Sequence, residues 1–394
     1  MMTAYIISGS RTAFGTFGGS LANTTDIDLG VVATKEAINR SKISTEDIGE
    51  IVFGNIIQTN ESSAYLARHI GLKSGLAYES SALTVNRLCG SGLQAIVTVA
   101  KEINLGTYDV GVAGGTENMS QAPHVLQGTR FGSPNKAPNV VDMLWSTLHD
   151  TVAGCGMGMT AENLAEKYSI SQEEQDQFAF ESHKRAATAQ KSGRFEEEIV
   201  PVTIKRGKKS LEFKEDEHIR AEISVEKLAT LKPAFKKDGT VTAGNSSGIN
   251  DGAAAVVIVS DAYLQQHQLK PLAKIVASAT AGVDPTIMGI GPVPAIQKLL
   301  KQTNLTTDDI GLFELNEAFA AQSLAVIKEL GLNSKIVNVN GGAVALGHPV
   351  GASGARIAYS LSLEMQKRGV KYGVASLCIG GGQGIAVLLE NPSV

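Results

Sequence analysis

The sequence is poor in cysteine and metal-binding motifs and has no long apolar run, and each shortage excludes a class of protein. Three cysteines among 394 residues cannot form a disulfide framework, which points to a reducing compartment and an expected cytoplasmic location. No stretch of about 18 consecutive apolar residues occurs, so no transmembrane helix is expected. No two cysteines have C-x-x-C spacing and no G-x-x-x-x-G-K-[ST] loop is present, so neither a metal nor another cofactor is expected.

Charge and composition indicate a folded protein that does not bind nucleic acid. The 35 basic and 39 acidic residues give a net charge of −4, which argues against a nucleic-acid partner. With 43% hydrophobic and 19% charged residues, the chain is not a disordered polypeptide. A strand-like run begins at Ala4, so no cleaved signal or transit peptide is expected before it. Glycine is abundant, at 42 residues, and is typical of tight turns around active sites.

The chain contains an internal repeat at an offset of 262 residues. Residues 43–49 (ISTEDIG) match residues 305–311 (LTTDDIG), and the same offset pairs Ser91-Gly92 with Ser353-Gly354. A recurrent helix-capping phrase is the alternative explanation of the first match. Because the offset also recovers the second glycine site, a duplicated architecture is the preferred interpretation.

Each copy of the repeat predicts helix, strand, helix and strand in that order. The predicted ranges are 31–40, 51–53, 91–103 and 109–113 in the first copy, and 294–302, 312–313, 353–367 and 373–377 in the second. This alternation indicates the α/β class, with one mixed sheet in each half. The intervening segment differs: it carries a predicted helix over 172–191 and a basic stretch over 201–240. That stretch is either an ordinary surface loop or a recruiter of a polyanionic ligand.

Two cysteines and a histidine lie in glycine-rich surroundings that suit catalysis. Cys89 separates a predicted strand (82–85) from a predicted helix, and the helix N-terminus would favour its thiolate. His348, followed by Pro349 in a glycine-rich turn, is a candidate general base, with an ordinary loop histidine as the alternative. Cys378 ends a predicted strand before three glycines, where a buried structural thiol is equally compatible. Cys155 has no activating neighbour in the sequence and is expected to be structural.

Asn316 is the fourth candidate. It follows a predicted strand and precedes a helical pattern, so it is either a helix N-cap or an amide directed at a substrate oxygen.

Seven phrases, in order along the whole chain, resemble the thiolase family and in particular its acetyl-CoA acetyltransferases. They are 86–92 (NRLCGSG), 113–119 (AGGTENM), 232–235 (KPAF), 242–252 (TAGNSSGINDG), 316–319 (NEAF), 347–349 (GHP) and 378–380 (CIG). The resemblance implies a duplicated α-β-α-β-α layered fold with an inserted loop domain. The implied parts are an N-terminal half (1–118 and 249–270), a loop domain (119–248) and a C-terminal half (271–394).

The resemblance also implies a reversible Claisen condensation of two acetyl-CoA molecules to acetoacetyl-CoA and CoA. Cys89 would be the acylated nucleophile, His348 would take its proton, and Cys378 would be the second acid/base. Asn316, through a water, would act with His348 on the enolate, and the N–H groups of Cys89 and Gly380 would form the other oxyanion hole.

By the same matching, CoA would lie along the loop domain. The implied binding residues are Leu148, Met157, Arg220, Phe235, Ala243, Ser247, Met288, Ala318 and Phe319. Arg220 would contact the nucleotide, Ser247 the pantetheine, and Met288 would restrict the acyl pocket to short chains. One position departs from the acetyl-specific pattern: Gly156 stands where those relatives usually carry histidine, which puts the chain-length preference in doubt.

Several alternatives stay open at this point. A 3-ketoacyl-CoA thiolase of broader chain length would use the same residues. A Cys-His-Asn hydrolase explains Cys89, His348 and Asn316 but gives Cys378 no role. A non-catalytic thiolase-like acyl carrier would need none of them, and a ketoacyl synthase normally pairs its cysteine with two histidines. The expected partners are acetyl-CoA, acetoacetyl-CoA, CoA and further copies of the chain; the resemblance implies a homotetramer, with a dimer as the alternative.

Overall fold

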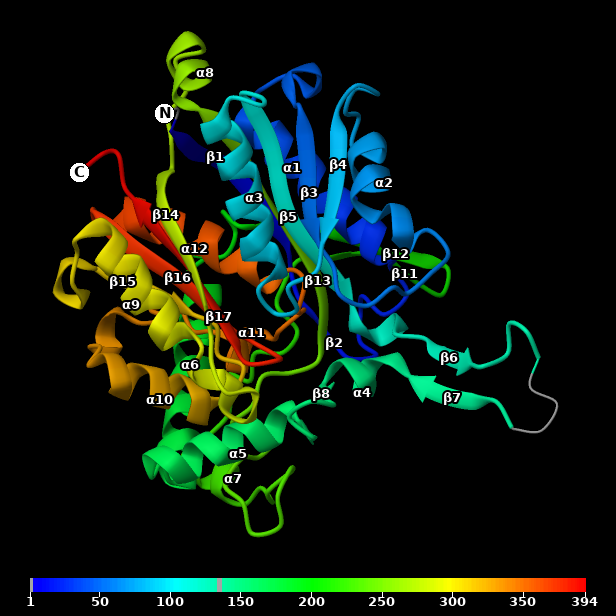
Figure 1. The fold of residues 1–394 in the computed structure, drawn as a ribbon, viewed down its shortest axis with the longest axis vertical. Helices are drawn as coiled ribbons and strands as arrows, with labels where there is room; N and C mark the ends of the chain where they lie inside the picture. The colour runs from blue at the N-terminus through cyan, green and yellow to red at the C-terminus, as the bar shows by residue number, and fades with distance from the viewer. Residues whose placement is uncertain (1–2, 133–136) are drawn as a thin grey trace.

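Two halves of similar construction share one sheet in the computed structural model, which describes residues 3–132 and 137–394 (Figure 1). The strand order in the first half is β4 (Ser81–Val85), β3 (Glu50–Gly54), β5 (Val110–Asn118), β13 (Asn250–Ser260) and β1 (Ala4–Thr12). The second half continues with β14 (Ala273–Gly282), β17 (Gln383–Glu390), β16 (Tyr372–Ile379) and β15 (Leu312–Leu315). The two expected sheets are therefore joined at one edge, where Tyr5 and Ile6 pair with Lys274 and Ala273.

The strand directions repeat between the halves. In the first half, β5 is parallel to β3 and antiparallel to β13. In the second half, β16 is parallel to β15 and antiparallel to β17. Each half is thus a mixed sheet with the same order counted from the shared edge. This confirms the duplicated architecture that the 262-residue offset predicted.

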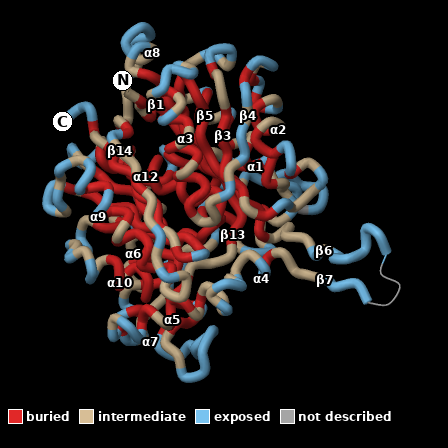
Figure 2. The backbone as a smooth tube through the Cα atoms, in the orientation of Figure 1, coloured by how far each residue is buried: buried red, intermediate tan, exposed pale blue. Residues whose placement is uncertain are grey.

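Helices form three layers around the sheet. The central layer is α3 (Ser91–Leu105) and α12 (Ser353–Arg368); the outer layers are α1 (Asp26–Ser41) with α2 (Leu66–Lys73), and α9 (Pro292–Thr303) with α10 (Ala320–Leu330). Strand β13 shows why the layers separate, because its side chains alternate. Val256 and Ile258 belong to the same core cluster as the central helices, and Val257 and Val259 pack with α1 and α2. The layered α-β-α-β-α fold is confirmed, and Figure 2 shows the buried backbone running through both halves.

The segment between the halves contains short elements and two longer helices. They are β6 (His124–Gln127), β7 (Asn139–Asp142), α4 (Met143–Thr147), β8 (His149–Asp150), β9 (Cys155–Gly156), α5 (Met157–Tyr168), α6 (Gln172–Lys191), β10 (Ile199–Val200), β11 (Val202–Arg206), β12 (Lys209–Phe213) and α7 (Val225–Ala229). The helix predicted over 172–191 is confirmed with those bounds, and Ser171 and Glu174 form its capping box.

The remaining elements are the strand β2 (Gly15–Thr16), the helices α8 (Asp261–Gln266) and α11 (Ala343–Leu346), and six short 3-10 helices. No described helix is both long and apolar enough to cross a membrane.

A buried ionic cluster fastens this segment to both halves. The Arg11 guanidinium, from β1, donates to both carboxylate oxygens of Asp216 at 2.7 and 2.8 Å and to Glu198 at 2.9 Å. Arg194 bridges Glu198 and Glu364 of α12, each at 2.7 Å. Every charge in the cluster is paired, as burial requires.

Candidate active site

Cys89 lies on a tight turn between β4 and α3. Leu88, immediately before it, adopts a left-handed backbone with φ of 46°, which costs a branched residue about 1–2 kcal/mol. Neighbouring side chains hold the turn: Asn86 Oδ1 accepts the Leu88 N–H at 2.9 Å. The Ser91 hydroxyl accepts the Arg87 N–H at 2.8 Å and donates to the Leu88 carbonyl at 2.7 Å. The thiol is therefore presented by a rigid, locally strained turn.

Burial, more than the helix N-terminus, sets the proton affinity of this thiol. Desolvation raises the pKa of Cys89 to about 11, although the N–H groups of Gly380 and of Cys89 itself hydrogen-bond to the sulfur and oppose the rise. The nearby Glu117 carboxylate raises the pKa further. Burial therefore opposes the thiolate that the helix N-terminus is expected to favour. The two N–H groups expected to form an oxyanion hole do meet at the sulfur.

Cys378 lies at the end of β16, fully buried, and its segment touches that of Cys89. A β-carbon placed on Gly90 would come within 2.6 Å of Cδ1 of Ile379, and one placed on Gly380 would lie 3.2 Å from Leu88. Burial raises the pKa of the Cys378 thiol well above its usual range, and the nearby Cys89 adds to the rise. The two cysteines, 289 positions apart, thus belong to one site.

The catalytic candidates His348 and Asn316 are in contact. His348 Nε2 lies 3.4 Å from Asn316 Nδ2, and His348 Nδ1 lies 2.5 Å from the Ser353 hydroxyl. That hydroxyl donates its one hydrogen to the Pro349 carbonyl at 3.0 Å, so it accepts from Nδ1–H. In this tautomer Nε2 carries no proton and accepts from the Asn316 Nδ2 group, so Nε2 is the ring nitrogen that can act as a base.

His348 is buried, and desolvation, with the Arg356 cation as a second cause, lowers its pKa to about 3. Its backbone N–H donates to Asn250 Oδ1 at 3.0 Å. The N-cap alternative for Asn316 is wrong, because α10 begins at Ala320. The buried Asn316 Oδ1 has no partner among the described residues, so it can accept a hydrogen bond from a water or a substrate.

Most of the expected CoA-binding residues lie in or beside the apolar clusters that contain the two cysteines. One apolar cluster contains Met157, Met288, Ala318, Phe319 and Cys378. The Phe235 ring meets the Phe319 ring edge-on with centroids 6.0 Å apart, and the Ser247 N–H donates to the Ala318 carbonyl at 3.0 Å. Leu148 packs in the neighbouring cluster that contains Cys89.

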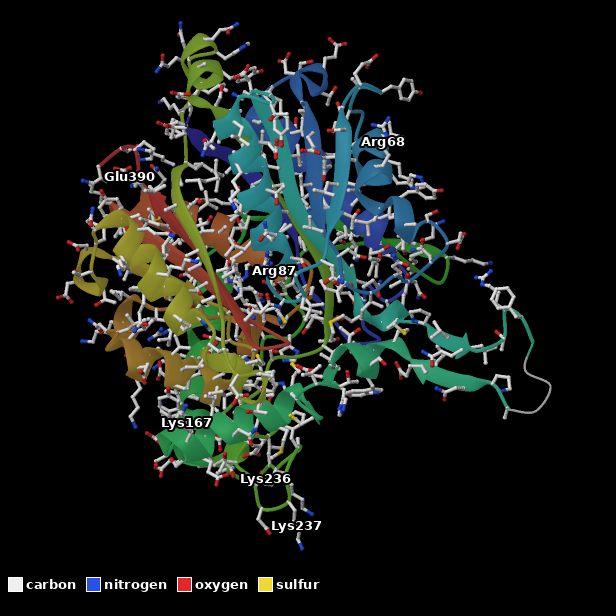
Figure 3. The ribbon with its side chains drawn as sticks, in the orientation of Figure 1. Arg68, Arg87, Lys167, Lys236, Lys237 and Glu390 are labelled. Carbon is white, nitrogen blue, oxygen red and sulfur yellow. The ribbon has the colours of Figure 1, made fainter. Side chains whose placement is uncertain are left out.

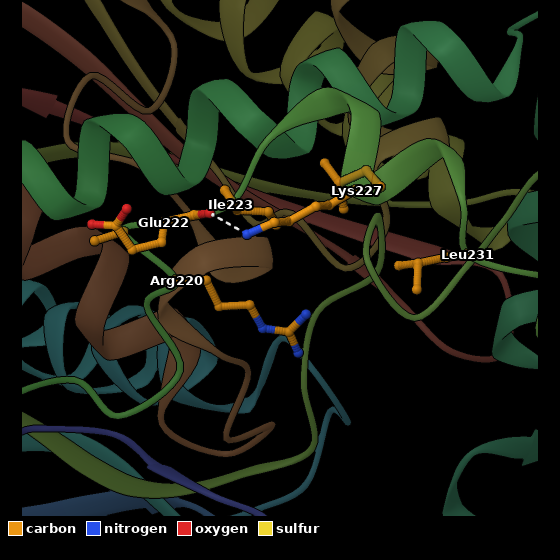
Figure 4. Close-up of a pocket in the computed structure, with 7 residues that line it drawn as sticks. Arg220, Glu222, Ile223, Lys227 and Leu231 are labelled. Atoms are coloured by element: carbon orange, nitrogen blue, oxygen red, sulfur yellow. Dashed lines mark hydrogen bonds between the residues drawn. The ribbon is translucent and has the colours of Figure 1, made fainter.

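A cavity of about 420 Å³ lies in the inserted segment (Figure 4). It is lined by Arg220, Ala221, Glu222, Ile223, Lys227, Leu228 and Leu231. Exposed Ala243 lies beside it, because a β-carbon on the adjacent Gly244 would contact Leu228 and Leu231. Arg220 and Lys227 come from the basic stretch, which continues to Lys236 and Lys237 on the loop beyond α7 (Figure 3).

Sequence reasoning missed two residues that hold the histidine, Ser353 and Asn250. A signal existed for Ser353, since the 262-residue offset pairs it with Ser91, which holds the cysteine turn. Cys155 is a free, half-exposed thiol on β9, and its structural role stays a prediction. Among the described residues no group of three or more histidine, cysteine or acidic side chains is arranged to bind a metal ion.

Comparison with known proteins agrees with this geometry. Residues 4–262 match the family described as "Thiolase, N-terminal domain" and residues 269–391 match "Thiolase, C-terminal domain". The chain belongs to the thiolase family. It is 49% identical to the acetyl-CoA acetyltransferase of Syntrophomonas wolfei and 48% identical to the mitochondrial 3-ketoacyl-CoA thiolase of Bos taurus, over 98% of each chain.

A solved structure of a relative shares the fold. The human mitochondrial 3-ketoacyl-CoA thiolase in complex with CoA superposes with a TM-score of 0.95, at 46% identity, covering 99% of this chain and 98% of that one. The protein is thus an acyltransferase of the thiolase family, and this argues against the hydrolase hypothesis. Because both acetyltransferases and 3-ketoacyl-CoA thiolases are similar to it, family membership alone does not define the acyl chain.

Proposed function

We propose that this thiolase is an acetyl-CoA C-acetyltransferase, which condenses two acetyl-CoA molecules reversibly to acetoacetyl-CoA and CoA through an acetyl-Cys89 intermediate. Two pairings carry the proposal: Cys89 acts on the nearby Cys378 thiol, and Nε2 of His348 lies beside the Asn316 amide. The chain next to the second pair packs with the cysteines, since Val350 shares the apolar cluster of Cys89 and Ala318 that of Cys378. A nucleophile, a second acid/base and a place for enolate charge are what a condensation needs.

In the first half-reaction the Cys89 sulfur attacks the acetyl carbonyl while Nε2 of His348 takes the thiol proton. Burial favours the neutral thiol and the neutral imidazole, so charge develops only when the thioester is in place. The carbonyl oxygen becomes an oxyanion beside the N–H groups of Cys89 and Gly380. The carbon–sulfur bond to CoA then breaks, and the departing CoA thiolate takes the Cys378 proton.

In the second half-reaction the Cys378 thiolate removes an α-proton from a second acetyl-CoA. The resulting carbon nucleophile attacks acetyl-Cys89, and the Cys89 sulfur leaves and recovers its proton from the His348 imidazolium. The enolate oxygen is stabilised by that imidazolium and by a water on the free Oδ1 of Asn316. Protons balance over the cycle, since two thioesters give one ketothioester and one CoA thiol.

We place the nucleotide of CoA in the cavity of Figure 4, with Arg220 and Lys227 against its phosphates. The pantetheine would then pass Ala243 and Ser247 and run between Phe235 and Leu148 to the cysteines. The apolar walls suit the pantetheine chain, and two cations at an otherwise acidic protein's cavity suit a polyanion. Substituting Arg220 by Ala should raise KM for every CoA ester without changing kcat.

A broader 3-ketoacyl-CoA thiolase is the second candidate, and Gly156 favours it. The backbone of Gly156 has φ of −77° and ψ of 162°, which any residue adopts, and a β-carbon there would contact only the Leu148 carbonyl, at 3.5 Å. The space beside Leu148 is therefore open. Against this, Met288 is buried in the cluster with Cys378 and reduces the room for an acyl chain.

Thiolysis kinetics with acetoacetyl-CoA and with longer 3-ketoacyl-CoA esters distinguish the two candidates. The acetyltransferase proposal expects kcat/KM to fall with each added pair of carbons, and equal values for the longer esters would contradict it. A Gly156→His variant should depress only the longer esters. A wild-type protein that forms no acetyl-Cys89 by mass spectrometry and shows no turnover would instead be a carrier.

We also propose a cytoplasmic homotetramer. The β6–β7 hairpin extends from the body of the chain, and its side chains Leu126 and Val140 are 60% and 59% exposed (Figures 1 and 2). An extended apolar hairpin suits contact with another copy. Light scattering after chromatography tests this: Leu126→Asp with Val140→Asp should give a smaller assembly, and an unchanged mass would count against it.

A further inference from the structure

A buried carboxylate, Glu117, joins the segments that carry the two halves of the proposed catalytic machinery. Each of its oxygens accepts two hydrogen bonds. Oε1 accepts from Ile57 N–H at 2.9 Å and Asn55 Nδ2 at 3.3 Å. Oε2 accepts from Gly351 N–H at 3.0 Å and Ile56 N–H at 3.2 Å. All four acceptor positions of the carboxylate are thus occupied by donors.

We propose that Glu117 is a positioning residue that holds the His348 turn in register with Cys89. Gly351, which Glu117 binds, lies three residues after His348 in the same turn. Ile56 and Ile57, which Glu117 also binds, pack in the apolar cluster that contains Cys89. One carboxylate therefore connects the base to the surroundings of the nucleophile. This inference rests on the proposed function, because it assumes that His348 and Cys89 react together.

The other flank of the turn is held separately. Glu317, also buried, accepts the Val344 N–H at 3.2 Å, four residues before His348, and its other partners are Ser182 at 2.7 Å and Asn338 at 2.8 Å. These contacts lie in the C-terminal half and the inserted segment. Of the two glutamates, Glu117 is the one that joins the halves, because it lies on β5 of the N-terminal half and binds Gly351 of the C-terminal half.

The four donors explain why an acid is needed at this position. Glutamine has the same shape as glutamate, but it would turn one acceptor oxygen into an NH₂ group that faces two N–H donors. Glu117→Gln should therefore displace either Gly351 or Ile57 by repulsion. Glu117→Asp keeps the charge and all acceptors on a shorter side chain, so it should restore part of the geometry.

The first experiment measures thiolysis of acetoacetyl-CoA by the full chain. For Glu117→Gln we expect kcat to fall by about 10–100-fold, as for an ångström-scale misplacement of a catalytic group, with KM nearly unchanged. Glu117→Asp should fall less. If Glu117 had a structural role alone, its substitution would lower thermal stability but would not lower kcat while leaving KM unchanged.

The second experiment needs no turnover. Iodoacetamide alkylates the Cys89 thiolate, and the rate is followed against pH with the modified peptide identified by mass spectrometry. Because the Glu117 anion raises the thiol's proton affinity, Glu117→Gln should move the midpoint of this profile to lower pH, and Glu117→Asp should leave it near that of the wild type.

Asp26→Asn is the matched control. Asp26 is also fully buried, and its carboxylate bonds the side chains of Thr59, Asn60 and Asn55. It shares the Asn55 donor with Glu117 but, within the described chain, bonds no residue of the His348 turn. It should lose stability but keep kcat. Equal losses of kcat in Asp26→Asn and Glu117→Gln, or wild-type kcat in Glu117→Gln, would overturn the inference. An inactive wild type would refute the proposed function instead, while the alkylation profiles still test Glu117.

Discussion

Gly354 packs directly onto the backbone of Leu93. A β-carbon on Gly354 would lie 2.2 Å from the Leu93 amide nitrogen, and one on Gly92 would lie 2.7 Å from the Ala355 nitrogen. Helices α3 and α12 therefore cross within their first turns, at Gly92 and Gly354. This crossing lies next to the turns that carry Cys89 and His348. The repeat places equivalent Ser-Gly pairs at this crossing, so the duplication itself brings together the starts of the two helices that follow Cys89 and His348.

Gly354→Ala should separate the two helices at this crossing. Because the obstructing atom is backbone, relief requires a helix shift, and overpacking of this kind costs about 1–3 kcal/mol. Urea denaturation and kcat should both report the change. Gly282→Ala is the control, since its nearest neighbour would be the Gly382 carbonyl oxygen at 3.9 Å, and it should behave as the wild type. Unaltered kcat in Gly354→Ala would show that the crossing does not set the site geometry.

Ligand-free Cys89 should be a poor nucleophile at neutral pH. Its raised pKa means that the thiolate fraction, and with it the iodoacetamide rate, should climb until the pH reaches about 11. The measurement is best made on a Cys378→Ser variant with the Cys89 peptide quantified, so that the Cys378 thiol does not contribute. A rate that levels off below pH 8 would mean that the helix N-terminus and the N–H groups outweigh burial.

Ser353→Ala should weaken the base without removing it. Without its acceptor, Nδ1–H of His348 loses the partner that fixes the tautomer, and we expect kcat to fall about 10–100-fold, at the lower end of general-base effects. KM should change little. Ser362→Ala, on the same helix and with its hydroxyl bonded only to the Ala358 carbonyl at 2.8 Å, should leave kcat unchanged. Comparable losses in both variants would point to a general defect in the helix.

Asn316→Ala should separate the two half-reactions. The amide is assigned to the enolate and not to the attack of Cys89, so acetylation by acetyl-CoA should persist while condensation and thiolysis decline. Intact-protein mass spectrometry measures the first and absorbance of acetoacetyl-CoA the second. Loss of the acetyl-enzyme in this variant would contradict the division of roles, and His348→Ala, which should lose both, is the comparison.

Much of the fold could be predicted because the internal repeat gives the order of helices and strands twice. The helix at 172–191, the strand ending at Cys378 and both glycine-led central helices follow from periodicity and end signals. The joining of the sheets, where Tyr5 pairs with Lys274 and Ile6 with Ala273, could not be predicted, since a pairing of only two residues on each strand leaves no pattern in the sequence.

Some residues of the candidate site could be predicted from the sequence and others could not. The residue types and glycine-rich settings of Cys89 and His348 identified them as candidates, whereas Asn316 was equally compatible with a helix cap until its partner was known. The upward pKa shift of Cys89 could not be predicted, because local sequence shows a helix N-terminus but not the desolvation of the thiol. Ser353 and Asn250 act through hydrogen bonds whose geometry only the assembled chain defines.

The buried cluster around Arg11 has a consequence for engineering. Exchanging the inserted segment with that of a related enzyme, to transplant a binding preference, would carry Asp216 and Glu198 away from the arginine they neutralise unless the donor supplies matching acids. Ion pairs therefore link the inserted segment to both halves, in addition to the chain itself. A chimaera should exchange Arg11, Arg194 and the acidic residues that pair with them together.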